Sequence, residues 1–118
     1  MANSKFRMDG PGVFRATARP FPGFLERLLA SAGTSLADID TVIPHQASAT
    51  ALQHLKRAIP DGHARTIDIF ADHGNQISVG LPHAMYHARA TGRLAPGSRS
   101  LLVGTSAGVS LGGAVIAW

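Results

Sequence analysis

Apolar residues recur at helical spacing in three stretches of the chain. The first runs from about Pro22 to Gly33, the second from Ala47 to Ile59, and the third from near Val79 to Gly92. In each stretch the apolar side chains return every three or four residues, which is typical of an amphipathic helix. Pro82 lies in the third stretch and is compatible with a helix only in its first turn. Three helices are therefore predicted.

Five shorter segments have the pattern of β-strands. They are continuously apolar or alternate between apolar and polar residues, and turn residues bound them. They are Lys5–Met8, Ile39–Ile43, Thr66–Phe70, Ser100–Thr105 and Val109–Ala117. The resulting order, βαβαβαββ, predicts an α/β fold with a mostly parallel sheet. The last two segments are separated by a tight turn, so we expect them to form an antiparallel addition at the sheet edge.

The uncharged C-terminal stretch, Leu101–Trp118, has two interpretations. Gly104, Gly108 and Gly112 form a GxxxGxxxG pattern, which in a membrane helix is a dimerisation face. The stretch is nevertheless short, rich in glycine and interrupted by hydroxyl residues, which makes a poor hydrocarbon span. Two buried strands joined by a glycine-rich turn are the preferred interpretation.

Length and composition indicate one globular domain over residues 1–118, with 45% hydrophobic and 15% charged residues. The N-terminus has no apolar segment of the kind found in signal peptides. The net charge is +4, which suits an anionic partner. The basic residues are too dispersed for a nucleic-acid surface, so neither nucleic acid nor membrane is an expected partner. The chain has no cysteine, which excludes a disulfide, a thiolate metal site and a cysteine nucleophile on these residues.

Candidate chemistry lies where the parallel strands end, because ligands of open α/β sheets bind at that edge. Three segments fall there: Pro44–Gln46, Asp72–Asn75 and Thr105–Gly108. They bring His45 and Asn75 to the same edge of the sheet. A neutral imidazole and a carboxamide both donate hydrogen bonds, and two convergent donors can form an oxyanion hole for a thioester carbonyl. The alternative is structural, with a capped turn at His45 and a helix N-cap at Asn75.

The other histidines give no metal site. His83 and His87 are four residues apart on the third predicted helix, a spacing that can hold zinc. No third ligand is evident near them, so we expect them to line a partly solvated helix face. Phosphate-binding glycine motifs and the Gly-x-Ser-x-Gly motif are also missing from the sequence.

Four sequence segments together resemble the C-terminal half of a β-ketoacyl-acyl-carrier-protein synthase III. They are Met8-Asp9-Gly10 followed by Val13-Phe14, then Ile43-Pro44-His45-Gln46-Ala47, then His73-Gly74-Asn75, then Gly112-Gly113-Ala114-Val115 before an aromatic C-terminus. The resemblance covers essentially the whole chain. It implies one half of a thiolase-like fold, with a five-stranded mixed sheet flanked by helices. The N-terminal half of that fold, which carries a cysteine, is absent from these residues.

The resemblance implies a cytoplasmic acyltransferase that condenses an acyl-CoA with malonyl-acyl-carrier protein in fatty acid or related polyketide-type biosynthesis. In the family, the cysteine of the N-terminal half is acylated. His45 and Asn75 would then hold the malonyl thioester oxygen while carbon dioxide leaves, which stabilises an enolate-like state. The substrates need no further cofactor. Because the nucleophilic cysteine is missing, the isolated chain is expected to be inactive.

The resemblance also implies a site for the pantetheine arm and a docking surface for the acidic carrier protein. The matching positions are Gly10, Phe14 and Ser48 for the arm, and Arg15, Lys56 and Arg57 for the carrier protein. Ser48 stands where the family usually has asparagine, and Gln76 and Ile77 replace small residues. Because of these departures, the resemblance does not determine which acyl group the protein uses.

Two partners follow from a half-fold. Its apolar face is expected to contact the missing N-terminal half and to favour a homo-oligomer.

The alternative function is a non-catalytic thiolase-fold subunit that binds or stabilises an active ketosynthase. A cysteine-bearing half encoded upstream would favour the enzyme, and a complete chain beside an intact synthase would favour the partner subunit.

Overall fold

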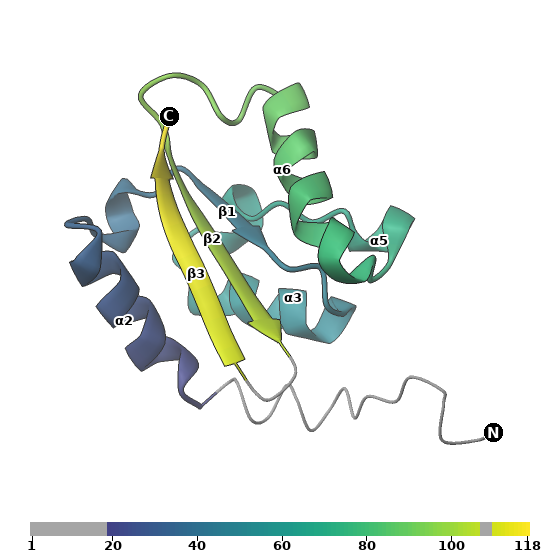
Figure 1. Ribbon diagram of the computed structural model, residues 1–118, viewed down its shortest axis with the longest axis horizontal. Helices are drawn as coiled ribbons and strands as arrows, with labels where there is room; N and C mark the ends of the chain where they lie inside the picture. The colour runs from purple at the N-terminus through teal and green to yellow at the C-terminus, as the bar shows by residue number, and fades with distance from the viewer. Residues whose placement is uncertain (1–18, 107–109) are drawn as a thin grey trace.

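The computed structural model describes residues 19–106 and 110–118. Its helices and strands, in chain order, are α2 (Phe21–Ser31), β1 (Thr41–Pro44), α3 (Ala49–Ala58), α4 (Gly62–Arg65), α5 (Phe70–His73), α6 (Gly80–Ala90), β2 (Arg99–Ser106) and β3 (Ser110–Ala117), with 3₁₀ turns η2 (Leu36–Asp38) and η3 (Ile77–Val79). The strands form a central layer, with α2 on one side and α6 on the other (Figure 1).

The sheet has the order β1-β2-β3 among the described residues. β1 is parallel to β2, and β2 is antiparallel to β3. The predicted antiparallel addition at the edge is therefore confirmed. Pro44 pairs with Val103 in the parallel register, so the chain leaves β1 beside Gly104.

The three predicted helices are confirmed as α2, α3 and α6. Pro22 lies at the start of α2, and Gly33 follows its end with φ +66°, a conformation that glycine adopts without a steric penalty. The Ser48 hydroxyl accepts a hydrogen bond from the N–H of Ala51 at 3.1 Å and caps α3. Pro82 lies in the first turn of α6, where its missing N–H costs nothing.

Five strands were expected, and the described part of the chain has three. The predicted strand Thr66–Phe70 is wrong: Thr66 makes one isolated parallel bridge with Val42, and the chain then enters α5. The Ile67 N–H still donates to the Val42 carbonyl, but β1 ends at Pro44, which has no N–H to continue the pairing. The predicted strand Lys5–Met8 lies outside the described residues. The short elements α4, α5, η2 and η3 were not predicted.

The C-terminal stretch forms strands, as preferred from the sequence. No helix within the described residues is long and apolar enough to cross a membrane. Four consecutive residues of β2, 100–103, are buried, but five of the eight residues of β3 are exposed. The expectation that both strands are buried is therefore wrong for β3, which lies at the edge of the sheet.

Alternating residues of the strands build a core on each face of the sheet. One cluster lies between the sheet and helices α2 and α3; its buried members are Leu25, Leu29, Ile39, Val42, Leu55, Ile59, Leu101 and Val103. The other lies between the sheet and α6; its buried members are Ile43, Ile67, Ile69, Ala84, Ala88 and Leu102. The chain after Thr66 thus contributes to the core without forming a strand.

Two adjacent glycines of β3 offer a matched test of this packing. A Cβ on Gly113 would lie 2.7 Å from the Leu102 carbonyl oxygen and 2.8 Å from Leu28 Cδ2, whereas one on Gly112 meets no atom within 4 Å. Gly113→Ala is expected to lower the free energy of unfolding by about 1–3 kcal/mol through overpacking. Gly112→Ala should change it by less than about 0.5 kcal/mol. Urea unfolding of both variants checks this, and equal losses would contradict the packing of α2 on β3.

Candidate active site

His45 lies directly after β1, at the carboxyl end of the parallel strands. Its N–H donates to the Val103 carbonyl at 2.8 Å, which ties it to β2. The side chain is close to two glycines: a Cβ on Gly104 would lie 3.4 Å from His45 Cβ, and one on Gly80 would lie 3.7 Å from His45 Nδ1. The imidazole therefore lies near the start of α6, and the His45 Cβ lies near the end of β2.

Burial lowers the pKa of His45 from its ordinary value of 6.5, because the charged imidazolium is poorly solvated there. The neutral ring is thus favoured near neutral pH. A neutral imidazole carries one N–H donor and one acceptor nitrogen. The site can therefore offer a hydrogen bond without placing a full positive charge in the fold.

This pKa shift predicts a pH dependence of stability. The unfolded chain protonates His45 with a pKa near 6.5, while the folded chain resists protonation until lower pH. The unfolded state then binds more protons, so the His45 contribution to stability is greatest above this value and falls as the pH drops below it. His45→Asn should therefore show a smaller decrease in the free energy of unfolding between about pH 7.5 and about pH 5.5 than the unmodified chain. Urea unfolding at the two pH values measures this decrease. Parallel losses in both proteins would contradict the buried neutral ring.

Asn75 lies in the loop between α5 and η3. Its Oδ1 accepts a hydrogen bond from the N–H of Ile77 at 2.8 Å, and its Nδ2 donates to the Ala47 carbonyl at 3.3 Å. Ala47 in turn donates its N–H to the His45 carbonyl at 3.0 Å. The structure therefore brings the two candidate loops together through Ala47. Convergence of the side-chain nitrogens of His45 and Asn75 on one point stays a prediction.

The Asn75 loop has a strained backbone and an anchor on α6. Ile77 has φ +57°, which is rare for a β-branched residue and is often found at functional sites. His83 Nδ1 lies 2.7 Å from Gln76 Oε1, a hydrogen-bond distance. The ring of His83 also contacts that of His73, with centroids 4.4 Å apart. His83 was expected to line a partly solvated helix face, and its contact with Gln76 was not predicted. The departure from the family at Gln76 was the available signal.

The remaining predicted site residues are placed as follows. Ser48 caps α3 through its hydroxyl, which gives it a structural role beside the expected one in substrate binding. Lys56 forms an ion pair with Asp68 at 2.7 Å, and Arg57 is exposed. Three further predicted residues lie outside the described part of the chain: Gly10, Phe14 and Arg15. Within residues 19–106 and 110–118, no three His, Asp or Glu side chains group as metal ligands would.

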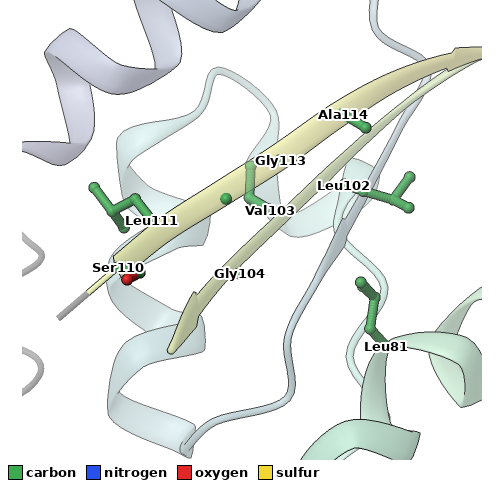
Figure 2. A pocket seen from close by; sticks show the side chains of 9 residues that line it. Leu81, Leu102, Val103, Gly104, Ser110, Leu111, Gly113 and Ala114 are labelled. Carbon is green, nitrogen blue, oxygen red and sulfur yellow. The ribbon is translucent and has the colours of Figure 1, made fainter. Parts of the chain in front are cut away.

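A shallow, mainly apolar depression of about 410 Å³ lies along β2 and β3. Figure 2 shows Leu81 extending from α6 on the same side as Leu102 of β2, with β3 crossing the view. Gly104 lines the depression, and a Cβ on it would lie 3.4 Å from His45 Cβ. The depression therefore extends to a residue that contacts the candidate donor.

Residues 29–118 match the family described as 3-Oxoacyl-[acyl-carrier-protein (ACP)] synthase III C terminal. The beta-ketoacyl-[acyl-carrier-protein] synthase III of Dinoroseobacter shibae is 34% identical over 112 residues, which cover 95% of this chain and 35% of the relative. Synthase III 3 of Streptomyces coelicolor is 32% identical over 118 residues, or 100% of this chain and 35% of the relative. The chain thus spans about a third of the length of the curated relatives it matches.

Solved structures agree with these matches. The 3-oxoacyl-(acyl carrier protein) synthase III of Pseudomonas aeruginosa PAO1 superposes with a TM-score of 0.84 and 29% identity, over 96% of this chain and 36% of that chain. The synthase III of Thermus thermophilus gives a TM-score of 0.86 and 27% identity, over 95% and 35%. These structures define the class as thiolase-like α/β. Within that class, the chain belongs to the family of C-terminal domains of 3-oxoacyl-[acyl-carrier-protein] synthase III.

Proposed function

We propose that this chain supplies the hydrogen-bond donors for the decarboxylation step of a 3-oxoacyl-[acyl-carrier-protein] synthase III. The substrates are an acyl-CoA and malonyl-acyl-carrier protein, and no other cofactor takes part. The observation that best supports this is the link through Ala47, which joins the loops of His45 and Asn75 at the carboxyl end of the parallel strands. A site at this edge can present two donors to one oxygen.

In the proposed step, the bond between the malonyl carboxylate and the α-carbon breaks and carbon dioxide leaves. The electron pair of that bond spreads over the α-carbon and the thioester oxygen. N–H groups of neutral His45 and of Asn75 stabilise this oxygen more strongly than the ground-state carbonyl, which lowers the barrier. The carbanion then attacks the acyl group on the cysteine of the N-terminal half, and the cysteine leaves as thiolate.

The donor inventory of Asn75 is compatible with this role. Its amide nitrogen has two N–H bonds, and the hydrogen bond described above occupies one of them on Ala47. The second N–H is the one proposed to reach the thioester oxygen. The hydrogen bonds at Ala47 and Ile77 would hold the amide in a fixed orientation, so little reorganisation is needed when charge develops.

The N-terminal half of the synthase is the main proposed partner. Three large apolar side chains are exposed on η3 and α6, close to the Asn75 loop in sequence: Ile77 at 71%, Val79 at 58% and Tyr86 at 71%. Exposed apolar groups of this kind often mark a contact surface. We propose that the cysteine-bearing half covers them, and that the assembled enzyme is a cytoplasmic homo-oligomer.

The carrier protein is the second proposed partner. Arg57 is exposed at the end of α3, and a basic residue there can steer an acidic protein toward the site. Lys56 is engaged with Asp68, with side-chain exposures of 11% and 28%, so it would contribute less. Docking is therefore assigned to Arg57, together with Arg15 from outside the described residues.

A chimera tests the proposal. The C-terminal third of the Dinoroseobacter shibae relative is replaced by this chain, and condensation of acetyl-CoA with malonyl-acyl-carrier protein is measured. We expect turnover that depends on the cysteine of the N-terminal part. Transfer of labelled acetyl to that cysteine reports whether the chimera is assembled. A chimera that accepts acetyl but neither decarboxylates nor condenses would contradict the proposal and favour a non-catalytic subunit.

A further inference from the structure

Gln46 is the polar side chain next to His45, and it is completely buried with 0% exposure. Its Nε2 donates to the Pro44 carbonyl at 3.0 Å and to the Ile67 carbonyl at 3.1 Å. Its Oε1 accepts from the N–H of Ile69 at 2.9 Å. The carboxamide thus uses both N–H groups and its oxygen on backbone atoms.

These contacts replace the strand pairing that ends at Thr66. The Ile67 N–H still donates to the Val42 carbonyl at 2.9 Å, but β1 stops at Pro44. The next two backbone groups, the Ile67 carbonyl and the Ile69 N–H, pair with the Gln46 side chain instead. A peptide group on a neighbouring parallel strand would make the same kind of pair. The carboxamide therefore continues the hydrogen bonding where the backbone turns away.

Three consecutive residues are consequently tied to three different segments. His45 is bonded to β2 through Val103, Gln46 to residues 67–69, and Ala47 to Asn75. The bond to β2 fixes only the backbone N–H of His45. The direction in which its ring leaves the chain also depends on the residues on either side. The Gln46 side chain bonds the Pro44 carbonyl on one side and anchors Gln46 itself to residues 67–69 on the other.

We propose that Gln46 is a positioning residue that fixes the His45 imidazole beside Gly80, with the His45 Cβ beside Gly104. The inference rests on the proposed function only in calling His45 a catalytic donor, because the positioning itself is a property of the folded chain. Misplacing a reacting group by about 1 Å commonly costs about 10²-fold in rate. Gln46 would thus act on catalysis without touching substrate.

Gln46→Met tests this in the full 118-residue chain. Methionine has similar length but cannot bond the three backbone groups. We expect the nuclear Overhauser contacts between the His45 ring and Gly80 to be lost, and the His45 pKa to rise toward its ordinary value as water reaches the ring. The matched control is Thr41→Val. It removes the 3.2 Å hydrogen bond to the Arg93 carbonyl from an equally buried side chain at the other end of β1, and should preserve both signals.

Gln46→Glu is the second variant, used if Gln46→Met does not fold. A glutamate side chain keeps an acceptor for Ile69 but has at most one O–H in place of the two N–H groups. At least one of the bonds to Pro44 and Ile67 is therefore lost, and the same ring contacts should weaken. Unchanged ring contacts in a folded Gln46 variant, or equal loss in Thr41→Val, would overturn the proposal. These readouts need no catalysis. If they fail while His45→Ala still blocks decarboxylation, only the positioning role of Gln46 is overturned. If they succeed while His45→Ala leaves decarboxylation intact, only the proposed function is overturned.

Discussion

The 118-residue chain alone is expected to show no condensation of acetyl-CoA with malonyl-acyl-carrier protein. The reaction needs a thiolate to accept the acyl group, and the chain contains no cysteine. The expected effect is complete loss relative to the chimera with a cysteine-bearing half. The measurement is formation of 3-oxoacyl-acyl-carrier protein by mass spectrometry, with equal molar amounts of chain and chimera.

The matched control is the same chimera with its N-terminal cysteine replaced by alanine. It should be as inactive in condensation as the chain alone, because both lack the nucleophile. Sustained product formation by the purified chain would mean that the acyl group is accepted by another residue, and the roles proposed here for His45 and Asn75 would have to be abandoned.

His45→Ala and Asn75→Ala are each expected to reduce condensation by the chimera by about 10²–10³-fold, the usual cost of losing one oxyanion donor. Because the two donors serve one oxygen, the double variant should be little worse than the poorer single variant. Steady-state rates at saturating malonyl-acyl-carrier protein measure both effects.

His63→Ala is the matched control for these variants. His63 is an exposed histidine on α4, and its replacement should leave the rate nearly unchanged. Losses for His45→Ala and Asn75→Ala that multiply in the double variant would indicate two independent roles instead of one shared oxygen.

The helices were predictable because their signals are local. Apolar residues at three- and four-residue spacing, Pro22 near the start of α2 and Gly33 after its end all act within one segment of chain. The antiparallel pair at the C-terminus was also predictable, because its two segments are separated by a short glycine-containing turn. Tertiary contacts determine how these elements pack together, but not where each of them forms.

The segment Thr66–Phe70 was not predictable in this way. Its alternation does place Ile67 and Ile69 in the core, as it would in a strand. The end of the neighbouring strand at about Ile43 was predicted. The pattern of Thr66–Phe70 cannot report that a side chain distant in sequence, Gln46, bonds its exposed backbone groups. Burial periodicity and strand pairing are separate properties. The local sequence predicts the burial periodicity, whereas strand pairing depends on tertiary contacts.

The candidate site also has features that the sequence predicts and features that depend on tertiary packing. The edge rule for parallel sheets predicted that the loops of His45 and Asn75 lie near each other, and their link through Ala47 agrees with that. The contact between Gln76 and His83 depends on where α6 packs, so spacing along the chain could not reveal it. Ser48 was expected only to bind substrate, and the predicted helix began before it at Ala47, so its capping bond to Ala51 was not predicted.

The division of labour between the two reaction steps tests the central claim most directly. In the His45→Ala chimera, release of labelled carbon dioxide from malonyl-acyl-carrier protein is measured beside transfer of labelled acetyl to the cysteine. Acylation develops charge on the primer oxygen, and decarboxylation develops it on the malonyl thioester oxygen that His45 and Asn75 are proposed to hold. We expect carbon dioxide release to fall about 10²–10³-fold while acetyl transfer stays close to that of the unmodified chimera. Equal loss of both steps would show that His45 shapes the fold or the cysteine's surroundings, and would contradict the proposed role.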